Sequence, residues 1–153
     1  MWSLELKIPP PAVALIVAVT MWTISLLGEP LAVTAVVRAA VAGIVAVVGG
    51  AFSVSGVISF RRARTTVNPT KPQAASSLVT SGVYRLTRNP MYVGLLLVLV
   101  AWAIFLSSAW TLAGPPAFLL YITRFQIQPE ERVLAAIFGT AYSNYKDKVR
   151  RWL

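Results

Sequence analysis

The sequence predicts an all-helical integral membrane protein, a bundle of four membrane-spanning helices followed by short cytosolic helices. Hydrophobic residues make up 57% of its 153 residues, and only five acidic residues stand against fourteen Lys and Arg. The apolar residues also gather into four segments that approach the roughly 20 residues needed to cross a bilayer. A nucleic-acid-binding domain can be equally basic, but it lacks long apolar runs. We therefore expect one membrane domain over residues 1–153, in contact with lipids and not with nucleic acid.

The four predicted spans cover residues 12–27, 31–60, 91–107 and 110–127, and a cytosolic tail covers residues 128–153. The second span is longer than the hydrocarbon layer is thick, so it must tilt, bend or emerge. Its small residues Ala42, Ala46 and Gly50 recur every four positions, a spacing that favours packing inside the bundle over dimerisation. In the fourth span, Pro115 and Pro116 predict a kink or a delayed start of the regular helix.

Basic residues predict the orientation of these spans. Twelve of the fourteen Lys and Arg lie between the second and third spans or from Arg124 onward, whereas the turns at residues 28–30 and 107–108 carry none. Because basic loops stay in the cytoplasm, both termini and the loop of residues 61–89 should face it. The sequence thus predicts an inner-membrane protein in which any site formed by this loop and the tail faces the cytoplasm, and it leaves the oligomeric state open.

The chain has no cysteine and no histidine. This composition excludes disulfides, thiol nucleophiles, Ser–His relays and Cys or His metal sites, so we expect no metal. Among the few acids, the adjacent pair Glu130 and Glu131 is the leading candidate for binding a cationic ligand. The alternative is that the pair only interacts with the positive end of a helix that begins near Pro129. Gly139 should end that helix.

The tail has apolar residues at helical spacing. We expect them to dock two short helices against the membrane surface or the bundle. They are Val133, Leu134, Ile137 and Phe138 in the first helix, and Tyr142, Tyr145, Val149 and Trp152 in the second.

The start of the third span should lie near this tail, because the third and fourth spans form a short hairpin. Asn89 precedes Pro90, so its default role is to cap the helix. Tyr92 is by default an aromatic residue of the membrane interface. The alternative is that both side chains form part of a ligand pocket.

Two stretches carry a resemblance to a known family. "LVTSGVYRLTRNPMYVG" and, after the hairpin, "IQPEERVLAAIFGTAYSNYKDKVRRWL" resemble the membrane-embedded methyltransferase superfamily of isoprenylcysteine carboxyl methyltransferases and phospholipid N-methyltransferases. That family's pattern is Gly-x-Tyr, Arg-His-Pro-x-Tyr-x-Gly, Glu-Glu-x-x-Leu, Phe-Gly and a spaced Tyr pair. The match covers about the second half of the chain, and as an ordered set it is specific.

The resemblance implies that S-adenosylmethionine binds in a cytosol-facing pocket between the hairpin and the tail. Two positions depart from the pattern: Asn89 replaces the usual His, and Gln126 stands where an Arg often precedes the Glu pair, with Arg124 two residues earlier. Since Asn does not titrate near neutrality, binding is expected there and acid–base chemistry is not. The implied cofactor-binding residues are Gly82, Tyr84, Asn89, Pro90, Tyr92, Glu130 and Glu131, and the implied catalytic residues are Arg88 and Arg124.

The activity that the resemblance implies is methyl transfer from S-adenosylmethionine to a lipophilic or lipid-modified acceptor at the membrane interface. It would be similar to carboxyl O-methylation of an isoprenylcysteine. Two alternatives stay open: N-methylation of a phospholipid amine, and a non-catalytic membrane protein that kept the fold.

Overall fold

The computed structural model describes residues 4–29, 31–65, 70 and 72–153, and these residues contain helices but no strand. The all-helical prediction is confirmed. Pro30 of the predicted turn at residues 28–30 and Lys71 of the long loop lie outside the described residues. The helices are α1 (Pro10–Ser25), α2 (Ala35–Arg62), α3 (Pro90–Leu106), α4 (Gly114–Ile122) and α5 (Gln128–Lys148), with 3-10 turns at Pro72–Ala74, Gly82–Arg85 and Ala109–Ala113 and a π-helical turn at Thr123–Ile127.

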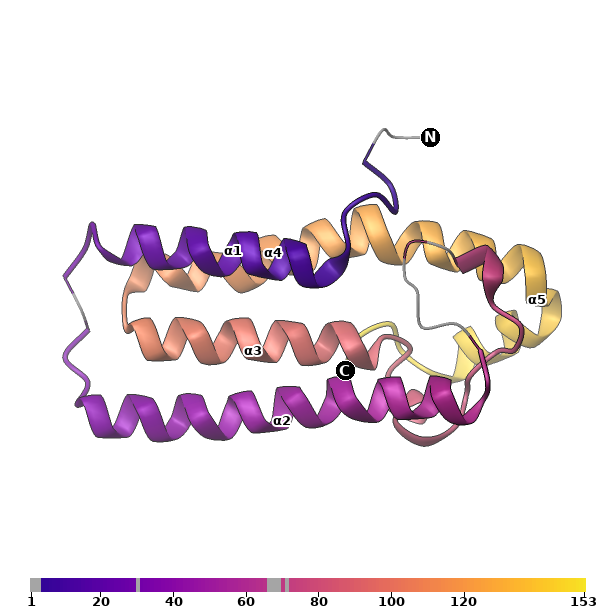
Figure 1. The fold of residues 1–153 in the computed structure, drawn as a ribbon, viewed down its shortest axis with the longest axis horizontal. Helices are drawn as coiled ribbons and strands as arrows, with labels where there is room; N and C mark the ends of the chain where they lie inside the picture. The colour runs from indigo at the N-terminus through magenta and orange to yellow at the C-terminus, as the bar shows by residue number, and fades with distance from the viewer. Residues whose placement is uncertain (1–3, 30, 66–69, 71) are drawn as a thin grey trace.

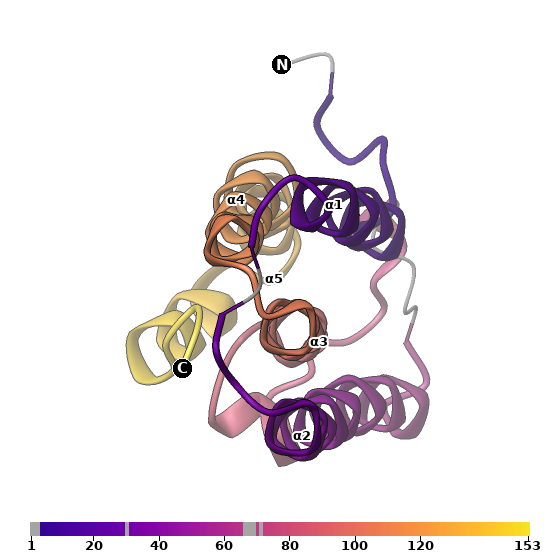
Figure 2. The same ribbon diagram turned by 90° about the vertical axis from the view of Figure 1, so that its left-hand side faces the viewer.

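Helix α3 occupies the middle of the bundle. Figures 1 and 2 show it between α2 on one side and α1 with α4 on the other. The buried core joins α1, α3 and α4 through Met21, Leu99, Phe118 and Ile122. Helix α5 extends beyond the end of the bundle, on the side where the chain between α2 and α3 lies (Figure 1).

Among the described residues, one helix is both long enough and apolar enough to cross a membrane, and it is the 28-residue α2. Helices α1 and α3 are apolar but shorter, with 16 and 17 residues. Helix α4 has nine residues before the π-helical turn begins. By length and composition, α2 is therefore a candidate for the second of the four predicted spans.

The contact between α2 and α3 is the most extensive helix pairing, and it uses a different stripe of small residues from the predicted one. The buried residues of α2 are Ala42, Gly49 and Gly56. A Cβ atom added at Gly49 would lie 2.8 Å from the carbonyl oxygen of Gly94, whereas one added at Gly50 would meet nothing within 4 Å. The predicted stripe is correct only at Ala42, because residues seven apart stay on one face over this length better than residues four apart.

Prolines and glycines shape the second half of the chain largely as predicted. Pro115 and Pro116 lie in the first turn of α4, which begins only after the 3-10 turn at Ala109–Ala113, so the delayed start is confirmed. Gly139 has φ 50° and ψ −123° and interrupts α5. Helix α5 begins at Gln128, close to the predicted start near Pro129, and the π-helical turn connects it directly to α4.

Candidate functional site

A pocket opens where the first residues of α3, both halves of α5 and the chain between α2 and α3 meet. Its volume is about 110 Å³, well above the roughly 10 to 15 Å³ that a single water requires. Most of the lining is apolar or aromatic, and three charged side chains converge on it. The lining residues are Phe60, Pro72, Ala75, Ser77, Leu78, Val79, Tyr84, Arg88, Asn89, Met91, Tyr92, Ile127, Glu130, Glu131, Leu134, Tyr142 and Tyr145.

Glu130 is held by two neutral hydrogen-bond donors. The Tyr92 hydroxyl and the Gln126 Nε2 each donate to its Oε1 at 2.6 Å. Within the described residues, no Lys or Arg forms an ion pair with Glu130. Burial raises the pKa of Glu130 to about 7, and the two hydrogen bonds counteract part of that rise. At neutral pH this carboxyl group is therefore only partly ionised, and its ionised form has no matching positive charge among the described residues.

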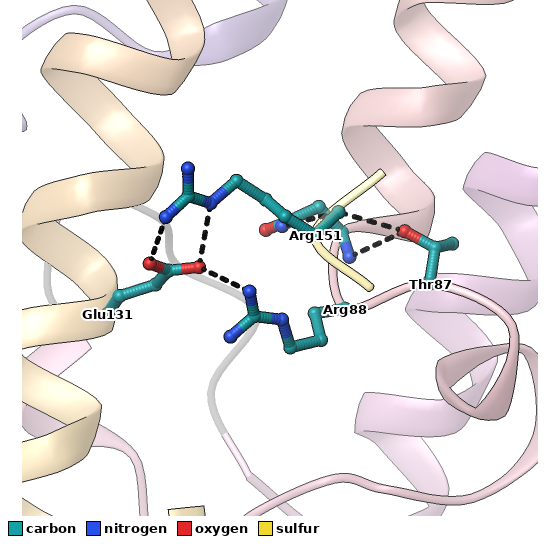
Figure 3. A network of polar contacts seen from close by, with 5 residues as sticks. Thr87, Arg88, Glu131 and Arg151 are labelled. Atoms are coloured by element: carbon teal, nitrogen blue, oxygen red, sulfur yellow. Dashed lines mark hydrogen bonds and ion pairs between the residues drawn. The ribbon is translucent and has the colours of Figure 1, made fainter. Parts of the chain in front are cut away.

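Glu131 has the opposite surroundings. Arg151 donates to it from Nε at 3.0 Å and from Nη2 at 2.7 Å, and Arg88 Nη2 lies 3.2 Å from its Oε1 (Figure 3). Only 14% of the Glu131 side chain and 8% of the Arg88 side chain are exposed. The forked bond from Arg151 is the geometry in which guanidinium and carboxylate bind each other best. Glu131 is thus neutralised by two cations.

Arg88 keeps unused donors although it is buried. Its Nε and Nη1 atoms have no hydrogen-bond partner among the described residues. A buried donor without a partner costs free energy, more so for a charged group. In a pocket, such a donor indicates a place for an anionic group of a ligand.

Three tyrosines form much of the aromatic wall. The Tyr145 hydroxyl donates to the Tyr84 carbonyl at 2.7 Å, and the Tyr84 ring packs edge-on against Phe60 at 5.4 Å between centroids. Burial raises the pKa of Tyr142 to about 12 and that of Tyr84 and Tyr145 further. These hydroxyls therefore stay protonated at neutral pH.

The Asn89 side chain makes no hydrogen bond to the first turn of α3. The prediction that Asn89 caps this helix is therefore wrong. Its Nδ2 instead donates to the Arg151 carbonyl at 3.0 Å, and Thr87 Oγ1 donates to the same oxygen at 3.0 Å. The Arg88 N–H donates to the Arg150 carbonyl at 2.9 Å. The segment before α3 thereby fastens the end of the chain beside the pocket.

The structure brings six of the nine predicted site residues into the pocket wall. Tyr92 is one of them and is buried, which contradicts its default role at the membrane interface. Gly82 opens the 3-10 turn that carries Tyr84, with φ +62°, and Pro90 is the buried first residue of α3; neither lines the pocket. The six are Tyr84, Arg88, Asn89, Tyr92, Glu130 and Glu131.

Arg124 lies outside the pocket wall. It pairs with Glu5 at 3.2 Å, and Arg132 pairs with the other oxygen of Glu5 at 2.6 Å. Leu6 adds a bond from its N–H to the Phe125 carbonyl at 3.1 Å. These contacts attach the N-terminal segment to the π-helical turn that carries Gln126.

Sequence reasoning missed the roles of Glu5 and Arg151. Glu5 pairs with arginines more than a hundred positions away, and Arg151 pairs with a glutamate 20 positions away. Neither residue belongs to a local sequence pattern. The one available signal is the scarcity of acidic residues. Because the chain has only five acids and fourteen Lys and Arg, a buried acid can be paired with two arginines. Gln126 stood out only as a departure from the family pattern, whereas it is buried against Glu130.

Comparisons with known proteins identify a family that covers most of the pocket residues. Residues 37–141 match the family described as phospholipid methyltransferase, a range that contains every pocket residue except Tyr142 and Tyr145. An "Uncharacterized protein" of Haemophilus influenzae is 48% identical over 63 residues, which are 41% of this chain and 100% of that protein. No solved structure matches. The expected membrane methyltransferase family is confirmed, and the chain belongs to the phospholipid methyltransferase family.

Proposed function

We propose that this protein transfers a methyl group from S-adenosylmethionine to a lipophilic acceptor at the membrane interface. The family supports methyl transfer to a membrane lipid. When bound, S-adenosylmethionine supplies an electrophilic methyl group on a positively charged sulfur.

The charges of the pocket fit this cofactor. Its amino-acid end carries a carboxylate and an ammonium group beside the sulfonium. Among the described residues, Arg88 has buried donors without partners, and the ionised form of Glu130 has no paired cation. This juxtaposition of an incompletely bonded cation with an uncompensated anion carries the proposal, since it complements a ligand that bears both charges.

The residues of the pocket act by binding and orientation. Arg88 would hold the carboxylate of the cofactor, and Glu130, oriented by Tyr92 and Gln126, would attract its positive groups. The aromatic wall would cover the nucleoside and exclude water. Methyl transfer is an in-line displacement, so alignment of donor and acceptor can supply much of the rate enhancement.

The charges also favour an amine as the acceptor over a carboxylate. Arg88 would already bind the cofactor, and Arg151 is occupied by Glu131. An acceptor carboxylate would then meet Glu130 and find no further cation among the described lining residues. A phospholipid amine is therefore the preferred acceptor, and an isoprenylcysteine carboxylate is the alternative.

Isothermal titration of the detergent-purified protein with S-adenosylmethionine tests the cofactor. We expect binding in the micromolar range, followed by transfer of labelled methyl to an amine phospholipid and not to a prenylated cysteine. Labelling of the prenylated cysteine alone would reverse the assignment of the acceptor. If the protein shows no binding, it is a non-catalytic member that kept the fold.

We further propose that four segments cross the inner membrane, with both termini and the pocket in the cytoplasm. Exposed apolar side chains along the helices support contact with lipid, among them Leu15, Val36, Val47 and Leu120. Cysteines placed singly at the exposed Ser76 and Ser143 should react with a membrane-impermeant reagent only after lysis. Reaction of Ser76→Cys in intact cells would contradict this topology.

A further inference from the structure

The last residues of the chain form part of the site. Three hydrogen bonds from the segment before α3 fasten the backbone of Arg150 and Arg151: one from the Arg88 N–H, one from Thr87 Oγ1 and one from Asn89 Nδ2. Trp152 packs against the core of the bundle. The Arg151 side chain is consequently held beside Glu131, as Figure 3 shows.

Glu131 is contacted by two arginines but accepts a forked pair of hydrogen bonds from only one of them. Arg151 takes both carboxylate oxygens with its Nε and Nη2, and Arg88 is left with a single Nη2 contact at 3.2 Å. As a result, Arg88 Nε and Nη1 remain without a hydrogen-bond partner among the described residues. Arg88 thus forms no fork with Glu131 while Arg151 contacts both carboxylate oxygens.

We propose that Arg151 is a positioning residue: by occupying Glu131, it keeps the Arg88 guanidinium available for the carboxylate of the bound cofactor. The inference rests on the proposed function, which identifies that cofactor. In the absence of the Arg151 guanidinium, Glu131 would pair fully with Arg88, and a ligand carboxylate would have to compete with it. Tyr142 also lies beside this cluster, and Glu131, Arg88 and Arg151 all influence its pKa. Its hydroxyl stays neutral, so Tyr142 cannot replace the charge of Arg151.

A pair of ligands isolates this effect. S-adenosylhomocysteine carries the amino-acid group, and methylthioadenosine has the same nucleoside without it. In isothermal titration of Arg151→Gln, affinity for S-adenosylhomocysteine should fall about 10- to 100-fold, the effect of losing a charge-assisted bond. Affinity for methylthioadenosine should be unchanged. An equal loss for both ligands would mean that Arg151 only supports the shape of the pocket, and it would overturn the inference.

Arg150→Gln is the matched control, because the Arg150 side chain makes no hydrogen bond or ion pair within the described residues and its exposed position leaves the pocket untouched. It should bind both ligands as the wild type does. Arg151→Lys keeps a positive charge beside Glu131 without the forked bond. Its affinity for S-adenosylhomocysteine should therefore fall less, again with no change for methylthioadenosine. This variant replaces Arg151→Gln in the test if Arg151→Gln does not fold. Wild-type protein that binds neither ligand would contradict the proposed function, whereas wild-type binding with no selective loss in either Arg151 variant would contradict this inference alone.

Discussion

The Glu130 side and the Glu131 side of the pocket differ in how their negative charge is compensated. Glu130 faces α3 and the π-helical turn, where its hydrogen-bond partners Tyr92 and Gln126 are neutral. Glu131 faces the segment before α3 and the chain end, where Arg88 and Arg151 are charged. Successive residues of a helix point about 100° apart, so neighbours in sequence reach different walls. Two adjacent glutamates can thus serve different purposes, one for the ligand and one for the fold.

The difference has opposite consequences for stability. Removing one partner of a buried ion pair leaves the other charge uncompensated and is strongly destabilising. Removing a buried carboxylate that has no cation relieves a desolvation penalty. Substitution of the two residues by the same neutral amide should therefore move the free energy of unfolding in opposite directions.

The largest effect is expected for Glu131→Gln. The variant leaves Arg88 and Arg151 without their carboxylate, and we expect a loss of about 3 kcal/mol, at the lower end of the range for buried pairs because Arg151 is 33% exposed. Denaturant unfolding in detergent, followed by tryptophan fluorescence, measures it. If the variant had the same unfolding free energy as the wild type, the charge compensation of Glu131 would not stabilise the fold, and the proposed difference between Glu130 and Glu131 would be wrong.

Glu130→Gln should instead stabilise the protein at neutral and higher pH. The pKa of Glu130 is raised from 4.5 to about 7, so between these values the folded protein keeps a proton that the unfolded chain has lost. Wild-type stability from this group is therefore full below the lower value and falls as pH rises to the upper one. The variant lacks this decrease and should exceed the wild type by up to about 3 kcal/mol near pH 8.

Melting temperatures of both proteins across this pH range provide the measurement, since the advantage of Glu130→Gln should shrink towards acidic pH. The same variant should bind S-adenosylmethionine about 10- to 100-fold more weakly, because it lacks the negative charge. A variant that is less stable than the wild type near pH 8 would show that Glu130, too, is needed mainly for the fold.

Much of this arrangement can be read from local sequence. The all-helical class, the delayed start at Pro115 and Pro116 and the interruption at Gly139 each follow from the backbone chemistry of one or two residues. The Glu pair and the family pattern indicate the pocket wall, since six of the nine residues that they mark line it.

The remaining features depend on distant partners. The α2 stripe follows from where α3 lies, so Gly49 faces Gly94 whereas Gly50 does not. Asn89 has the sequence context of a cap but bonds to the Arg151 carbonyl, 62 residues away. The positions of Arg124 and Arg151 depend on which acid each one meets, and no local pattern encodes that choice.

The smallest effect is expected at Asn89, and it tests the attachment of the chain end on the Glu131 side. Asn89→Ala removes one neutral hydrogen bond to the Arg151 carbonyl, so stability should fall by about 0.5 to 1.5 kcal/mol. Asn89→Ser should lose nearly as much, because the native side chain makes no cap bond that Ser would preserve. Melting temperature measures the loss, and trypsin cleavage at the C-terminal arginines, followed by intact mass, should be faster in both variants. A contradicting result would be wild-type stability and cleavage rate in Asn89→Ser together with lower stability and faster cleavage in Asn89→Ala. Helix capping would then account for the contribution of Asn89, and its hydrogen bond to the Arg151 carbonyl would not stabilise the protein.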